Sequence, residues 1–172
     1  MDARQFVLGI VILLVFWAFQ AGYFSSLGPP ALFVGAIIFV ILTWIIGKGI
    51  MPNPPAENKQ MWNFVVVFLI IVSIIASFVP PNVLGAVLPA GFDFSMVVPF
   101  ILALWLVLFG AAMFVTGHEM KMGMAQVIGL IWLFSAITFV GNAGPNAYLH
   151  FGIVTGLTFI LGGIFSGSAG KK

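Results

Sequence analysis

One short segment of the chain combines a histidine with three alternating methionines. Residues 118–124 read HEMKMGM. Thioether sulfur is a soft ligand that suits Cu(I), and imidazole also binds copper. The candidate metal ligands are therefore His118, Met120, Met122 and Met124, with copper as the candidate cofactor. The alternative interpretation is structural, because methionine fills irregular gaps in packed apolar regions and the positive charge of Lys121 opposes a bound cation.

The other ionisable residues do not assemble a catalytic site. No acidic residue falls inside an apolar run, and the four lie near the chain start or between runs: Asp2, Glu57, Asp93 and Glu119. His118 and His150 fall at opposite ends of their runs, about 30 Å apart, so they cannot ligate one metal or haem. Cysteine is absent, which excludes thiol catalysis and Cys-ligated clusters. We therefore predict that the chain is not an enzyme.

Uncharged polar side chains do fall within the apolar runs. One interpretation is that they line a pathway for a small neutral solute. The other is that they form hydrogen bonds between helices. The residues kept as candidate pore groups are Gln20, Gln126, Ser135 and Thr138.

Small residues mark a candidate packing face near the end of the chain. Gly152 and Gly156 are four residues apart, as are Gly163 and Gly167. Glycines at this spacing share one helix face and allow another backbone to approach closely. The face could serve the chain's own bundle or a partner subunit.

The composition requires a membrane as the surroundings of these residues. Apolar residues make up 62% of the 172 residues and charged residues 6%, whereas a soluble domain carries about 25% charged residues. A helix needs about 20 apolar residues to cross a bilayer. We predict one all-α membrane-embedded domain over 1–172, with six transmembrane helices at Phe6–Phe24, Ala31–Ile50, Trp62–Val79, Met96–Thr116, Met124–Val140 and Tyr148–Phe165.

The charges give the expected orientation of these helices. With six spans, all six basic residues fall on one side: Arg4, Lys48, Lys59, Lys121, Lys171 and Lys172. The positive-inside rule then places both termini in the cytoplasm and makes the chain a multi-pass cell-membrane protein.

The six spans form three hairpins, and the first and third resemble each other. Residues 8–11 read LGIV and residues 128–131 read IGLI, while 28–31 read GPPA and 144–147 read GPNA. A duplication would relate the hairpins by an axis along the membrane normal. The outer connection at 80–95 is long and apolar at its centre. It is either a re-entrant segment or an interfacial cap, because so short a run cannot span.

Three functions fit this pattern. We favour a non-catalytic integral subunit of a larger membrane complex, because ionisable groups at depth are lacking and the loops are short. The alternatives are a passive channel or facilitator for a small neutral solute, and a Cu(I)-handling membrane protein. The expected partners are the lipid bilayer and other membrane subunits or further copies of the chain. A net charge of +2 without a basic patch does not support nucleic-acid binding.

Overall fold

The computed structural model describes residues 3–27, 30–50, 55–80, 82–83, 86, 96–142 and 146–169. Within these residues every regular element is helical. The elements are α1 (Ala3–Gln20), the 3₁₀ turn η1 (Ser25–Leu27), α2 (Pro30–Ile50), α3 (Ala56–Phe78), α5 (Val97–Glu119), α6 (Gly123–Asn142) and α7 (Ala147–Ala169). Each of the six predicted spans overlaps one α-helix, so the predicted all-α fold is confirmed.

Four of these helices are long and apolar enough to cross a membrane: α1, α3, α5 and α7. In α2 and α6 the described apolar stretches are shorter, Ala31–Leu42 and Gly123–Phe139. Helices suit this apolar composition because a helix satisfies its own backbone polar groups, which hydrocarbon cannot do. The predicted segment 80–95 lies largely outside the described residues.

A proline and a residue with positive φ define the ends of α3 and α5. Val79 is extended, with φ −83° and ψ 125°, because the following Pro80 disfavours helical geometry in the residue before it. At the end of α5, the Met120 N–H donates to the Thr116 carbonyl and Lys121 adopts a φ of 56°. This left-handed residue reverses the chain tightly into α6, so α5 and α6 are antiparallel neighbours.

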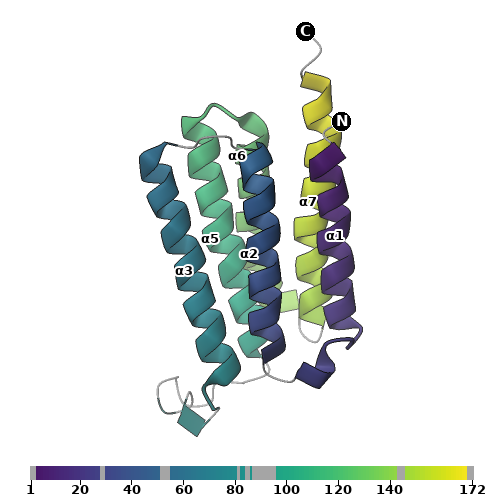
Figure 1. Cartoon of the computed structure of the whole chain (residues 1–172), viewed down its shortest axis with the longest axis vertical. Coiled ribbons are helices and arrows are strands. Elements are labelled where there is room, and N and C mark those ends of the chain that lie inside the picture. Colours follow the sequence, from purple (N-terminus) through teal and green to yellow (C-terminus); the bar gives the residue numbers. More distant parts are fainter. Residues whose placement is uncertain are drawn as a thin grey trace.

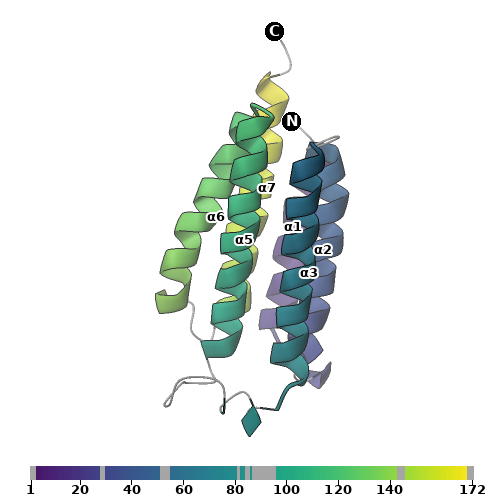
Figure 2. The ribbon, with the colours of Figure 1, turned by 90° about the vertical axis from the view of Figure 1, so that its left-hand side faces the viewer.

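The six helices stand side by side in one bundle (Figures 1 and 2), and we call their cycle of neighbour contacts the ring, across which α5 and α7 also contact each other directly. Each helix contacts the next, and α7 returns to α1. The α1·α7 and α5·α6 contacts are the most extensive, and the contacts of both α2 and α3 with their neighbours are less extensive. The start of α1, the start of α3, the α5–α6 turn and the end of α7 all lie at one end of the bundle (Figure 1). Exposed Arg4, Lys59 and Lys121 therefore gather at that end, which we call the terminal end.

Candidate functional site

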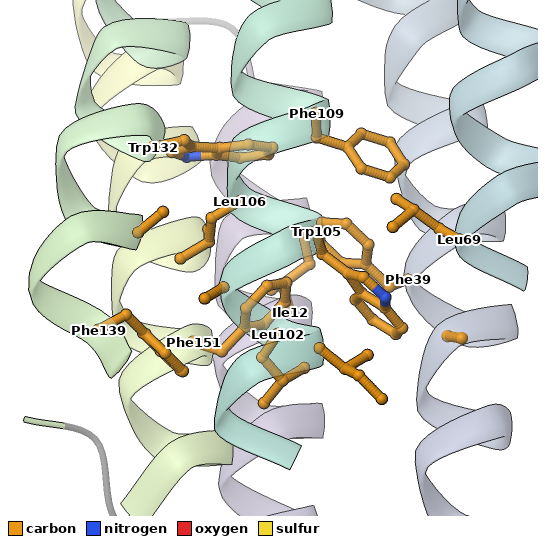
Figure 3. Close-up of a cluster of buried hydrophobic side chains, with 14 of the residues drawn as sticks. Ile12, Phe39, Leu69, Leu102, Trp105, Leu106, Phe109, Trp132, Phe139 and Phe151 are labelled. Carbon is orange, nitrogen blue, oxygen red and sulfur yellow. The ribbon is translucent and has the colours of Figure 1, made fainter. Parts of the chain in front are cut away.

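The middle of the ring is filled by aromatic side chains (Figure 3). Phe39 of α2 stacks on Trp105 of α5, with 5.6 Å between ring centroids and 20° between ring planes. The same phenylalanine meets Phe109 at 5.2 Å and Phe151 at 5.0 Å, both edge to face. All four side chains are at most 2% exposed. Rings from α2, α5 and α7 thus close the space where a central passage would run.

The α1·α7 contact is built on glycine. A Cβ added to Gly9 would lie 2.5 Å from the Gly156 carbonyl oxygen, and one added to Gly156 would lie 2.8 Å from the Gly9 oxygen. Gly152 contacts the Phe16 side chain, and Gly163 is buried. Three of the four predicted packing glycines thus face the chain's own core or α1. The surroundings of Gly167 lie outside the described residues.

The α5·α6 contact repeats this arrangement with glycines that the sequence did not assign to packing. A Cβ on Gly129 would lie 2.6 Å from the Gly110 oxygen, and one on Gly110 would lie 2.9 Å from the Gly129 oxygen. In both cases the second helix of one predicted hairpin (α7 or α5) packs on the first helix of another (α1 or α6). Gly9 and Gly129 are the glycines aligned by the similarity of residues 8–11 and 128–131. That similarity was the available signal for this role.

The third contact between hairpins, α2·α3, has no such pair, because α3 contains no glycine. Its side chains keep the two backbones apart, which explains why α2 and α3 contact each other less extensively than the glycine-based pairs do.

The candidate pore residues are dispersed over the bundle. The Gln20 side-chain oxygen accepts a 3.4 Å hydrogen bond from the Leu149 N–H, where α1 ends and α7 begins. Gln126 donates to the Gly117 carbonyl at 3.2 Å, near the terminal end. Ser135 is half-buried, and Thr138 is exposed and donates to the Ser135 carbonyl at 3.0 Å. Both glutamines therefore connect helices, and the four side chains do not converge on one pathway.

Three tryptophans differ in the hydrogen-bond partner of the indole N–H group. Trp132 of α6 donates its indole N–H to the Thr158 hydroxyl of α7 at 2.8 Å. Trp62 of α3 donates to the Thr116 hydroxyl of α5 at 3.0 Å. Trp105 is 2% exposed, and its indole N–H has no hydrogen-bond partner among the described residues.

The predicted copper ligands lie on the α5–α6 turn with different exposures. His118 is exposed, whereas Met120, Met122 and Met124 are half-buried and pack against the hydrophobic core. The three thioethers thus contribute to packing at this end of the bundle. Across the described ranges, no group of three or more His, Asp or Glu side chains is placed to hold a metal ion.

The outer surface between α5 and α6 carries a shallow groove of about 200 Å³. Its lining is apolar and offers no side-chain donor or acceptor to orient a polar ligand. The lining residues are Phe100, Ala103, Leu104, Val107, Ala136 and Ile137.

Comparison with known proteins gives no family for this chain: no family model, curated protein or solved structure matches it.

Proposed function

We propose that the chain is a non-catalytic integral subunit of a larger membrane protein complex. The observation that carries this proposal is the filled interior of the ring. Phe39, Trp105 and Trp132 are each at most 2% exposed at its centre. Among the described side chains the centre leaves no internal passage, and a bundle filled in this way would act through its ends and its outer surface.

Helix α3 is the element that supplies the proposed contact surface. Of its most apolar window, 22% is buried inside the bundle, against 56% for α5. Its outward face carries Phe64 and Phe68, which are 66% and 38% exposed and whose rings stack at 5.9 Å. Aromatic side chains are enriched at protein interfaces because they bury a large area at low conformational cost.

The proposed partner for this face is a transmembrane helix of another subunit. Helix α3 is held in the ring by looser contacts than the glycine-paired helices, so a further helix would complete its packing. In a bilayer such packing rests on van der Waals contact, since lipid is as apolar as the helix. The partner face should therefore offer small residues into which the Phe64 and Phe68 rings fit.

The first test is extraction from the native membrane in mild detergent, followed by native mass spectrometry. We expect a heteromeric complex of defined stoichiometry. Recovery of the chain only as a monomer or homo-oligomer would overturn the proposal.

The second test places a photo-crosslinking amino acid at Phe64 in the native membrane. Phe134 of α6 is the matched control, because it is the same residue type and is also 66% exposed. We expect a cross-link to a second polypeptide from position 64 and not from position 134. Equal cross-linking at both positions would reject α3 as the specific surface.

A further inference from the structure

One buried polar atom in the middle of α5 and one in the last turn of α3 lack a hydrogen-bond partner among the described residues. They are the Trp105 indole nitrogen and the Ser77 hydroxyl oxygen, for which no hydrogen bond is found in the part of the chain that the structure describes. Trp105 is 2% and Ser77 is 5% exposed. A buried polar atom without a partner is destabilising, and such atoms are commonly satisfied by ordered water.

The direction of the Trp105 nitrogen is fixed by the rings around it. Its indole stacks on Phe39 and meets Phe151 edge to face at 5.7 Å. Figure 3 shows the nitrogen on the side of the indole toward Phe39 and Leu69, which belong to α2 and α3. The Trp105 N–H therefore faces the side of the bundle formed by α2 and α3, where helix contacts are less extensive.

The register of α3 against α5 brings two serines to this level. The hydrogen bond from Trp62 to Thr116 pairs these positions on antiparallel helices. Each helix rises about 1.5 Å per residue, so eleven residues further along α3 Ser73 comes within about one helical turn of the level of Trp105. Ser73 and Ser77 lie on the buried stripe of α3 that also contains Leu69.

The available hydrogen-bonding groups are complementary to a molecule that both accepts and donates. The Ser73 hydroxyl donates to the Leu69 carbonyl at 2.7 Å, which leaves lone pairs on its oxygen able to accept. Trp105 can only donate, and Ser77 can do either. A buried water typically makes two to four such bonds.

We infer that α3 and α5 hold a binding site for one neutral, water-sized molecule between Trp105, Ser73 and Ser77. The molecule accepts the Trp105 N–H and donates to the serine oxygens. This site borders the aromatic centre on the side of α3 and does not depend on the proposed subunit function. Water is the ligand used to test it.

The test is nuclear magnetic resonance of the full chain in detergent micelles with ¹⁵N-labelled tryptophan. Trp105→Phe assigns the resonance, and the indole of Trp132 is the matched control because it is equally buried and bonded to Thr158. We expect magnetisation transfer from water to the Trp105 indole proton and none to that of Trp132. Ser73→Ala with Ser77→Ala should abolish the transfer at Trp105.

Two results would overturn the inference. One is the absence of transfer at the assigned Trp105 indole in the unsubstituted protein. The other is transfer that persists unchanged in the double alanine variant.

Thermal unfolding of Ser77→Ala gives an independent result. A hydrated site predicts a lower unfolding midpoint, because a partner of the bound water is lost. A dry site predicts a higher midpoint, because an unsatisfied polar atom is removed. The control for handling and detergent effects is Thr138→Val, which removes an exposed hydroxyl group on α6.

Discussion

Three buried hydroxyl groups in this bundle donate hydrogen bonds to backbone carbonyls of their own helix. Thr155 and Ser73 each donate to the carbonyl four residues earlier, at 2.7 Å. Thr158 also donates to backbone carbonyls, at Val154 and Thr155, while its oxygen accepts the Trp132 N–H. Thr158 thus links α6 to α7 through a hydrogen bond, because a hydroxyl group can donate one hydrogen bond and accept another at the same time.

Replacing Thr158 tests this tie between α6 and α7. Thr158→Val keeps the shape and leaves the Trp132 N–H buried without its acceptor, so we expect a loss of about 1–3 kcal/mol in unfolding free energy. Thr138→Val should change the same quantity little, because Thr138 is exposed. Denaturation followed by circular dichroism in micelles measures both, and equal effects would contradict the assigned role of Thr158.

The glycine contacts predict opposite effects of two alanine substitutions on the free energy of unfolding. In a helix interior Ala is favoured over Gly by about 1 kcal/mol, yet a Cβ at Gly9 would lie 2.5 Å from a backbone oxygen. Overpacking costs about 1–3 kcal/mol, so Gly9→Ala should destabilise the protein. Gly123→Ala should be neutral or stabilising, since nothing lies within 4 Å of its added Cβ. A more stable Gly9→Ala variant would show that α1 and α7 are not in backbone contact.

At the scale of elements, the ring consists of two tight helix pairs and two more loosely packed helices, α2 and α3. Backbone contact at Gly9–Gly156 and Gly110–Gly129 draws α1·α7 and α5·α6 together. Helix α3 has no glycine and relies on side-chain packing through Val65, Leu69 and the serines of its buried stripe. Regions with fewer packed contacts open more readily, so local opening should begin at α3.

Thiol labelling can compare the opening of α3 and α6 directly, because the chain has no cysteine. We expect Val65→Cys to react with maleimide faster than Ile128→Cys. The two native side chains are 5% and 2% exposed, and the Trp62–Thr116 and Gly110–Gly129 contacts place them at a similar level of the bundle. Equal or reversed rates would show that α3 is held as firmly as the paired helices.

For the whole molecule, the positive-inside rule predicts that the terminal end faces the cytoplasm. In intact cells a membrane-impermeant thiol reagent should label Asn82→Cys and should label Lys121→Cys only after permeabilisation. Both native side chains are exposed, so burial does not confound the comparison. The reverse pattern would invert the predicted orientation.

The filled interior also predicts how the purified chain behaves in liposomes. We expect no faster uptake of small neutral solutes than in protein-free liposomes, because aromatic rings occupy the centre of the ring. Gln20→Leu and Gln126→Leu should lower thermal stability, since each glutamine bonds a neighbouring helix. Solute uptake that requires either glutamine would favour the facilitator hypothesis over the proposed subunit role.

The sequence alone determined the class of protein and the positions of its helices. Hydrocarbon tolerates neither charge nor open backbone groups, so long apolar runs between charged or proline-rich connections could form little else. The sequence could not determine which faces meet, because residues on the lipid-facing and inward-facing sides are equally apolar. Tertiary structure decided that Gly9, Gly110 and Gly129 carry backbone contacts, that Met120 and Met122 pack on the core, and that Gln20 and Gln126 join helices. In a membrane these choices depend on close fit between helices rather than on exclusion from water.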